Sequence, residues 1–588
     1  MEKYKEAIEI PIPSDGGRVH LTAVGTSCLA SSPLSSVKIN GEECLNLSDD
    51  DDASLKYFDW CRAHADGSGR VSISFHTRNK DWTDNVDVPK FDVTVQDQNA
   101  TTCLSQSGVS ISKTPELVVS YVTTRSNGHE IVVHVRNDGK NDRTIQSLVV
   151  NGDDVDLTNT SLVESQQTRI FVIESNQVMK PGSIWIVSVQ SDKDSISSSW
   201  GGRVVNEFFP TLVWPKSSDC PETGSNEDEL QDLGINAVFV SDGSCGDPSR
   251  LDTKMKLSVK LKYLDDIAKA QRLDTIASVF IGDEVDGKIE AKNLRDPDIF
   301  DSYSKYPELP TYQGAKTNGH VGVYSGLTDI QGMDAYVGAC APTIVNVLKA
   351  LPITYSYDYL KVTRQNHAPL PTWLYSQLYD DVFFFFSILT SSFTLTRVYT
   401  HLLHRYSDAW SYQANANELF VQIMYTVMAG GKGVTLFQSY EKEFKEHDVK
   451  TLKKALLPIK SLGEYFRQGS VDGGVIEVKS DHNQLTQVVR TPDKLIVMVV
   501  NLDASGYSNL LCHTFIDKHW TFKSTTIDKI TVTVPSDIKI SNPTEQVGDD
   551  VVTSIKDCDV EFKSNNVVEL KNVKLDDKVV GRFFVFDV

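Results

Sequence analysis

The sequence of 588 residues predicts a multidomain protein in which a (β/α)8 barrel lies between β-sandwich domains, an α/β core with all-β flanks. Three observations predict this fold class. Short strands with Gly, Asp and Asn turns fill the chain up to residue 204. Strands and helices then alternate over residues 205–470, close to the roughly 250 residues of a typical TIM barrel. From residue 471 onward, alternating strands return without helices.

The flanking parts are predicted to be three β-sandwiches, at residues 1–112, 113–204 and 471–588. Apolar and polar residues alternate along their strands, as at 71–76, 131–136 and 495–501. We expect the second sandwich to be immunoglobulin-like, although it lacks the Cys…Trp…Cys signature.

The barrel, predicted at residues 205–470, has apolar runs for most of its strands. They lie at 209–215, 235–240, 275–282, 309–313, 330–337, 371–377 and 433–438. A third strand is expected near 241–256, where the pattern is blurred. Helices are predicted at 225–233, along the spacing of Leu257, Leu261, Leu264 and Ala268, and at 417–428.

The strand at 275–282 organises the predicted barrel. It is a continuous apolar run, typical of a parallel strand that is covered on both faces, and it ends in adjacent carboxylates, Asp283 and Glu284. In a parallel barrel, residues just past the C-terminal end of a strand form the mouth of the active site. An acidic pair there is costly unless it is solvated, paired or used.

Composition excludes some partners and favours others. A net charge of −21 argues against nucleic acid, since phosphate binding needs a basic surface. The apolar run 382–396 is shorter than the roughly 20 residues of a spanning helix and contains Ser and Thr, so no membrane span is expected. Sequons at Asn46, Asn99 and Asn159, with scattered cysteines, favour an extracellular or cell-surface protein, although the N-terminus resembles no signal peptide.

At four stretches the chain resembles the multidomain retaining glycoside hydrolases with (β/α)8 barrels, over about residues 115–510. The stretches are FIGDEVDG at strand four, GMDAYV at strand six, PTWLYSQ at strand seven and NELFVQIMYTVMAGGKGVTLFQ leading through strand eight. The resemblance implies that Glu284 is the general acid/base. The nucleophile of such enzymes ends strand seven, where this chain has Gln377.

Glycoside hydrolysis needs two carboxylates, of which one is protonated and one ionised. The candidates for catalysis are Glu284, Asp283 and Asp334, with Asp334 preferred as the partner because it ends strand six. Glu418 is expected to work structurally, since negative charge at a helix start complements the helix dipole.

Sugar binding is predicted from aromatic rings and amides near strand ends. The candidates are Trp214, Tyr336, Trp373, Tyr375, Trp410, Gln313, Gln377 and Gln438. Aromatic faces stack on sugars and amides pair with hydroxyls, but barrel packing is expected to claim about half of the rings. No metal or cofactor is expected, because His401 and His404 lack the H-E-x-x-H spacing.

The sequence therefore predicts a glycosidase that acts on a carbohydrate. The alternative is a non-catalytic surface or matrix protein that keeps the barrel as a sugar-binding or structural module. The sugar, the linkage and the oligomeric state stay open. We also expect a disulfide between Cys220 and Cys245, which would join two loops at the barrel mouth.

Overall fold

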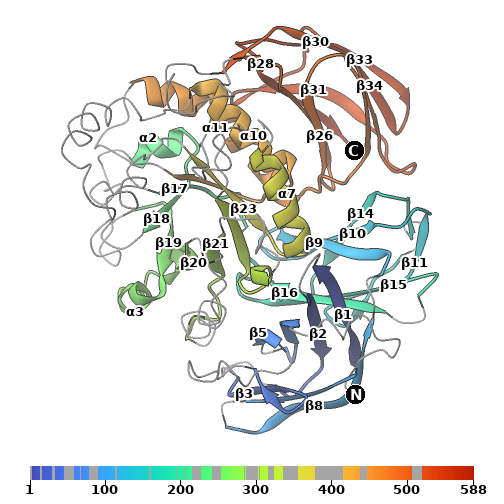
Figure 1. Cartoon of the computed structure of the whole chain (residues 1–588), viewed down its shortest axis with the longest axis vertical. Coiled ribbons are helices and arrows are strands. Elements are labelled where there is room, and N and C mark those ends of the chain that lie inside the picture. Colours follow the sequence, from blue (N-terminus) through green and yellow to red (C-terminus); the bar gives the residue numbers. More distant parts are fainter. Residues whose placement is uncertain are drawn as a thin grey trace, which may run out of the picture.

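The computed structural model shows a central barrel with β-sheet domains packed around it (Figure 1). The residues described are 3–12, 16–28, 34–44, 58–66, 68–77, 90–97, 99–112, 115–157, 161–194, 197–205, 207–214, 227–240, 253–283, 285, 302, 305–315, 323–334, 355–377, 415–437, 446–505 and 520–588. The run 382–396 lies outside them.

The first β domain is built on an eight-stranded sheet that folds over its own core. Its strand order is β4-β3-β7-β8-β1-β2-β6-β5, where the short parallel pairing of β1 with β8 joins two antiparallel halves. The rings of Phe75 and Phe91, one from each half, meet edge to face with centroids 5.4 Å apart. The strands are β1 Lys3–Ile12, β2 Gly16–Val24, β3 Ser36–Ile39, β4 Glu42–Glu43, β5 Phe58–Ala65, β6 Val71–Thr77, β7 Lys90–Gln96 and β8 Thr102–Ser112.

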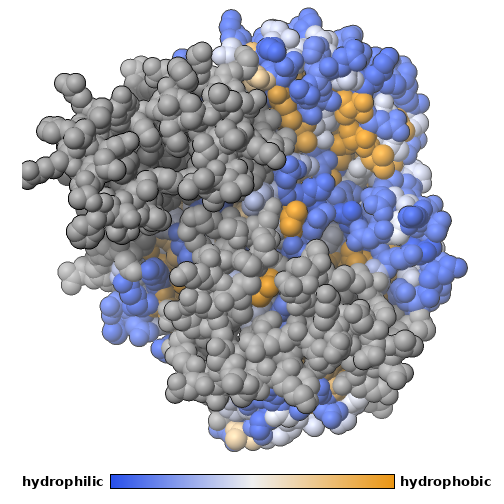
Figure 2. Space-filling model, in the orientation of Figure 1, coloured by the Kyte–Doolittle hydropathy of each residue, from blue (hydrophilic) through white to orange (hydrophobic). Residues whose placement is uncertain are grey.

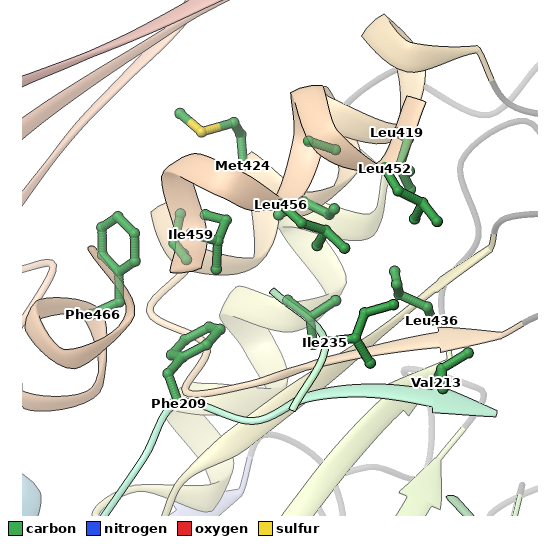
Figure 3. Close-up of a cluster of buried hydrophobic side chains, with 14 of the residues drawn as sticks. Phe209, Val213, Ile235, Leu419, Met424, Leu436, Leu452, Leu456, Ile459 and Phe466 are labelled. Atoms are coloured by element: carbon green, nitrogen blue, oxygen red, sulfur yellow. The ribbon is translucent and has the colours of Figure 1, made fainter. Parts of the chain in front are cut away.

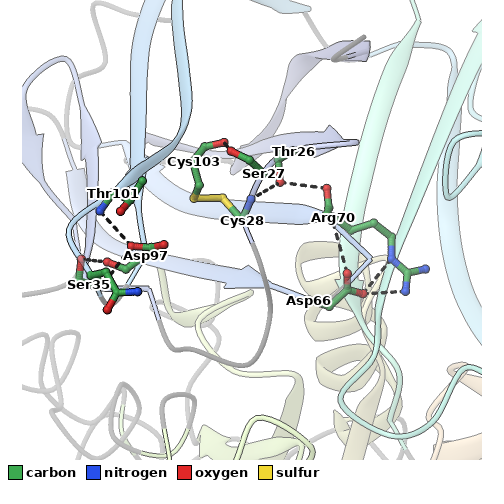
Figure 4. The surroundings of a disulfide bond; sticks show 11 residues. Thr26, Ser27, Cys28, Ser35, Asp66, Arg70, Asp97, Thr101 and Cys103 are labelled. Atoms are coloured by element: carbon green, nitrogen blue, oxygen red, sulfur yellow. Dashed lines mark hydrogen bonds and ion pairs between the residues drawn. A yellow bond between two sulfur atoms is a disulfide. The ribbon is translucent and has the colours of Figure 1, made fainter.

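Two disulfides cross-link this first domain. Cys28 is bonded to Cys103, with Cα atoms 4.7 Å apart, and Cys44 is bonded to Cys61, with Cα atoms 5.4 Å apart. Figure 4 shows the first of them beside the Ser27 hydroxyl, which donates a hydrogen bond to the Cys103 carbonyl. The bonded cysteines are 75 and 17 residues apart in the sequence, so the two bonds restrict the unfolded chain. The predicted pair Cys220 and Cys245 lies outside the described residues.

The second β domain has two antiparallel sheets around one core. One sheet has the order β14-β10-β9, and the other β12-β11-β15-β16, with β13 paired to β11. Trp185 and Trp200 are fully buried between them. The strands are β9 Leu117–Arg125, β10 Glu130–Asn137, β11 Arg143–Val150, β12 Asp153–Asp154, β13 Leu162–Val163, β14 Thr168–Glu174, β15 Ile184–Ser191 and β16 Ser198–Arg203.

The barrel closes with eight parallel strands, as predicted. They are β17 Thr211–Trp214, β18 Ala237–Val240, β19 Lys256–Lys260, β20 Ile276–Gly282, β21 Thr311–Ala315, β22 Ile330–Asp334, β23 Thr372–Gln377 and β24 Val434–Phe437. The third strand, β19, lies later than we expected. Leu257 belongs to this strand, whereas Leu264 begins helix α3, so a spacing that seemed helical crosses a strand-to-helix boundary.

Helices cover the outside of the barrel. They are α2 Glu227–Asp232, α3 Leu264–Lys269, α7 Tyr355–His367, α10 Ala416–Met428 and α11 Glu446–Gln468. Figure 3 shows how Leu456 of α11 and Leu419 of α10 lie over Val213 and Leu436, which point outward from β17 and β24. Because side chains alternate along a strand, their neighbours Leu212 and Thr435 occupy the barrel interior.

Helix α10 begins at a capping box that explains Glu418. The Asn415 side chain accepts hydrogen bonds from backbone N–H groups of the first turn, while Glu418 Oε2 accepts from the Asn415 N–H at 2.8 Å. Glu418 Oε1 accepts a second bond from the Trp520 N–H at 2.6 Å, which ties the helix to the C-terminal domain. The predicted structural role of Glu418 is confirmed.

The C-terminal domain packs two antiparallel sheets against each other, with a small two-stranded sheet of β28 and β29 beside them. The sheet orders are β25-β30-β34-β33 and β26-β27-β35-β31-β32. The strands are β25 Val475–Lys479, β26 Gln484–Arg490, β27 Lys494–Asn501, β28 Ala504–Ser505, β29 Thr521–Phe522, β30 Thr525–Thr533, β31 Ser541–Val547, β32 Asp550–Val552, β33 Asp559–Ser564, β34 Val567–Leu575 and β35 Gly581–Asp587. The barrel with β-rich flanks confirms the predicted fold class.

The described surface is largely hydrophilic in the view of Figure 2, with apolar areas over the C-terminal domain at upper right. Within the described residues, no helix combines the length and the apolar character that crossing a bilayer requires.

Candidate functional site at the barrel mouth

Aromatic rings fill the barrel interior below the mouth. Phe239, Phe280, Tyr312, Trp373 and Tyr375 belong to one buried cluster. The rings of Tyr312 and Tyr375 are stacked at 18°, with centroids 6.1 Å apart. Tyr312 is completely buried and Tyr375 is 1% exposed, so both hydroxyls lie inside the barrel wall.

Two predicted carboxylates flank these tyrosines. Asp283 directly follows β20 and is exposed, and Asp334 is the last residue of β22 and is half-buried. A Cβ atom built on Gly314 of β21 would lie 2.9 Å from Asp283 Oδ1 and 3.2 Å from the Tyr375 hydroxyl oxygen. The Asp283 carboxylate and the Tyr375 hydroxyl therefore converge on one point at the end of β21.

The strand register places Asp334 in the same site, because Asp334 of β22 pairs with Tyr375 of β23. Burial is the main cause that raises the pKa of both Tyr312 and Tyr375 well above the usual value, and the charges of Asp283 and Asp334 raise it further. Both carboxylates therefore lie close enough to act on both rings. The hydroxyls are therefore protonated, as tyrosines ordinarily are near neutral pH.

Glycines make this close approach possible. A Cβ atom on Gly332 of β22 would lie 2.6 Å from the Tyr312 hydroxyl oxygen and 2.8 Å from Cε2 of Tyr375. Real Cβ atoms do not come so near, so the two rings occupy space that any other residue at Gly332 would fill. The sequence interpretation missed Tyr312, Gly314 and Gly332. Their signal is the alternation along 311–315 and 330–334, which puts them on the face that Tyr375 shares.

Trp214 completes the described wall of the mouth. It is the last residue of β17 and is half-buried. Its ring lies 4.1 Å from that of Phe239 and 6.1 Å from that of Tyr375, measured between centroids. A partly open indole beside carboxylates and hydroxyls is suited to packing against the apolar face of a sugar ring.

Two predicted ligand-binding residues are placed elsewhere, and we correct them. Trp373 is 1% exposed and packs on Tyr312 with centroids 4.6 Å apart, so it fills the barrel core. The Gln313 side chain is 1% exposed, and its Nε2 donates to the carbonyl oxygen of Tyr324 at 3.0 Å and to Gln331 Oε1 at 2.7 Å. Alternation along β21 puts Gln313 on the face opposite to Tyr312.

The remaining predicted site residues lie at the edge of what the structure describes. Gln377 ends β23 and pairs with Phe437 of β24, and its backbone alone is described. Glu284, Tyr336, Trp410 and Gln438 lie outside the described residues, as do His401 and His404. Among the described residues, no group of three or more His, Cys, Asp or Glu side chains is arranged to hold a metal ion.

Comparison with solved structures gives distant likenesses to carbohydrate-active enzymes. A cycloisomaltooligosaccharide glucanotransferase from Paenibacillus sp. is 10% identical, with 80% of this chain and 99% of that chain covered and a TM-score of 0.36. A GH30 endoxylanase from Clostridium papyrosolvens is 9% identical, with 65% and 97% covered and a TM-score of 0.33. A putative β-galactosidase from Bacteroides fragilis is 11% identical, with 90% of each chain covered and a TM-score of 0.28.

No protein-family profile matches the sequence, and no curated protein matches it. We draw the functional proposal from the residues at the barrel mouth.

Proposed function

We propose that the barrel mouth binds a carbohydrate and hydrolyses an O-glycosidic bond. The observation that carries this is the convergence of the Asp283 carboxylate and the Tyr375 hydroxyl at Gly314, with Asp334 beside the same ring. These carboxylates and the half-buried indole of Trp214 provide polar and stacking contacts for a sugar. A net charge of −21 fits a neutral ligand rather than a polyanion.

Each residue has a distinct role in the proposed reaction. Glu284, which follows Asp283 in the sequence, donates the proton to the leaving oxygen, as the family resemblance implies. Asp334 acts as the ionised partner that attacks the anomeric carbon or activates water. Asp283 holds sugar hydroxyls and positions them against the two reacting carboxyl groups, while the buried Tyr375 hydroxyl lies behind Asp283 at Gly314.

Replacement of Glu284 tests this proposal. We expect Glu284→Gln to fold normally and to bind sugar, and to lose about 10²-fold or more in turnover, the usual contribution of general acid catalysis. The loss should be smaller on aryl glycosides with good leaving groups, which need little protonation. Turnover is measured on a panel of aryl glycosides and oligosaccharides.

The matched control is Glu229→Gln, the same change at an exposed position of α2. It should leave turnover unchanged. Full activity of Glu284→Gln on an oligosaccharide would show that the acid lies elsewhere.

A second function is favoured by one residue. Strand β23 ends in the amide Gln377, where the resembling enzymes carry a carboxylate nucleophile. The alternative is therefore a sugar-binding or structural module without turnover. A glycan array, combined with the turnover assay, separates the two functions. A wild-type protein that shows no turnover, and whose glycan binding equals that of Glu284→Gln, would support the module.

We also propose an extracellular or cell-surface location. The two disulfides of the first domain support it, because such bonds persist in oxidising compartments. Mass mapping of the native protein without reductant tests this, and recovery of all four cysteines as free thiols would contradict it.

A further inference from the structure

A buried cluster of charged residues joins the first β domain to the end of the barrel opposite the mouth. Arg18 of β2 and Arg62 of β5 come from the first domain, and Arg203 of β16 from the second. Asp329, the residue before β22, comes from the barrel. All four are at most 2% exposed, so the charges depend on one another rather than on water.

The arginines reach across the interface to the barrel. Arg62 Nη2 lies 3.2 Å from Asp329 Oδ1, and Arg203 Nε donates to the same oxygen at 3.2 Å. Arg18 donates to the backbone carbonyl oxygens of His367 and Ala368, at the end of α7. Two guanidinium groups, those of Arg62 and Arg203, thus share the Asp329 carboxylate, and the third, that of Arg18, is held by backbone carbonyls.

An aromatic anchor marks the same interface. Trp60 of β5 is completely buried against Val323, Tyr324 and Leu327 of the barrel. Its Nε1 donates to the Val323 carbonyl oxygen at 2.6 Å. The indole ring of Trp60 and the buried charges therefore hold the first domain on the barrel. Both would be exposed to water if the first domain separated from the barrel.

Three histidines are enclosed in this cluster. His20 of β2 and His367 of α7 are fully buried, and His64 of β5 is 7% exposed. His20 faces Arg18, Arg62 and His367, and its Nδ1 lies 2.9 Å from the Ser74 hydroxyl. His64 faces Arg62, Arg203 and Asp329.

The hydrogen bonds of His367 show that its ring is neutral. Its Nδ1 accepts a hydrogen bond from the Gly326 N–H at 3.0 Å, and its Nε2 lies 3.3 Å from the Asp329 carbonyl oxygen. A nitrogen that accepts carries no proton, so a second proton on this ring would break the bond to Gly326. It would also place a positive charge next to Arg18 and Arg62.

We propose that this cluster is an acid-sensitive latch, in which proton uptake by His20, His64 and His367 releases the first domain from the barrel. The docked state already buries three guanidinium groups with one carboxylate, which two of them contact, so it disfavours further positive charge. The released state exposes the histidines to water, where each is protonated below a pH of about 6.5.

The direction of the pH effect follows from this difference. Burial is the main cause that lowers the pKa of all three histidines well below the usual value, and neighbouring arginines lower it further. Docking is therefore fully stable above a pH of about 6.5 and weakens as the pH falls, by up to about tenfold per pH unit for each histidine. Burial raises the pKa of Asp329, but Arg203 and Arg62 outweigh burial, so this carboxylate stays charged throughout.

Small-angle X-ray scattering of the full chain between pH 7.5 and 4.5 tests the latch. Hydrogen exchange of peptides covering β5 and residues 323–330 is measured alongside, relative to β27 of the C-terminal domain at each pH. We expect the radius of gyration and the exchange at the interface to rise together below a pH of about 6, while β27 stays protected. The docking equilibrium should change by up to about 10³-fold per pH unit, since three protons are taken up.

The decisive variant is His20→Asn/His64→Gln/His367→Gln, in which the side chains keep hydrogen-bonding groups but do not titrate. We expect it to stay docked down to a pH of about 4.5. If it does not fold, His64→Gln alone should reduce the steepness from three protons to two. The exposed His129 provides the control His129→Gln, which should behave as the wild type. A wild-type protein that stays docked at pH 4.5, or a triple or His64→Gln variant that opens like the wild type, would overturn the proposal.

Discussion

The two ends of the barrel use the same kinds of residue for opposite purposes. At the mouth, Asp283 is exposed and Asp334 half-buried, with tyrosine hydroxyls beside them. At the other end, Asp329 is completely buried and receives hydrogen bonds from Arg203 and from the backbone and side chain of Thr311. Asp329, whose oxygens are used by protein groups, holds the structure together, whereas the proposed function assigns the carboxylates at the mouth to a ligand.

Strands β21 and β22 connect the two ends. Thr311 begins β21 at the buried charges, and Gly314 lies near its other end at the mouth. Asp329 precedes β22, and Asp334 ends it. The position of the mouth residues therefore depends on the register that Asp329 fixes at the start of both strands.

The largest effect is expected for Asp329→Asn. It leaves Arg62 and Arg203 buried without a counter-charge, and breaking a buried pair costs about 3–5 kcal/mol of unfolding free energy. Urea denaturation at pH 7.5 measures this loss. Asp228→Asn, on a side chain that is 87% exposed, is the matched control and should change the free energy by less than about 0.5 kcal/mol. A loss below about 1 kcal/mol for Asp329→Asn would show that Asp329 does not have the stabilising role that distinguishes this end of the barrel from the mouth.

An intermediate effect is expected for Gly332→Ala. The new methyl group would collide with Tyr312 and Tyr375, which are too enclosed to move freely, so overpacking should cost about 1–3 kcal/mol. Under the proposed function, ligand binding at the mouth should weaken as well, since Tyr375 would shift. Thermal unfolding measures the first effect. Adding Tyr312→Phe removes the nearest atom and should recover part of the stability; no recovery would locate the strain elsewhere.

The sequence predicted the fold better than the site, for physical reasons. Buried parallel strands are rich in apolar residues, and short apolar-rich segments between helical patterns marked every barrel strand except β19. There the strand Lys256–Lys260 passes directly into a 3-10 turn and then α3, so the apolar residues of two elements merge into one helix-like spacing.

For the site, strand ends indicated that Asp283, Asp334 and Tyr375 lie near the mouth, and the structure brings these three together. Gln313 was misplaced because sequence position gives the end of a strand but not which face turns inward. Gly314 and Gly332 contribute to the site because their missing side chains leave room for Asp283 and the two tyrosine rings. No sequence motif indicates such a role. The charge cluster around Asp329 joins residues of three domains, and only the folded chain brings them together.

The smallest effect is expected for Tyr375→Phe, and it tests the mouth end alone. The ring and its stacking on Tyr312 remain, so the unfolding free energy should change by no more than about 1 kcal/mol. The buried hydroxyl that meets Asp283 at Gly314 is lost, and with it a group that helps to position this carboxylate for the ligand. Under the proposed function we expect glycan affinity or turnover to fall about tenfold, equivalent to one hydrogen bond of about 1.4 kcal/mol.

Tyr425→Phe is the control for this variant. It removes a buried hydroxyl from α10, outside the barrel interior, and should leave affinity and turnover unchanged. Equal behaviour of the two variants in a titration with the best ligand of the glycan array would place the binding site away from Tyr375.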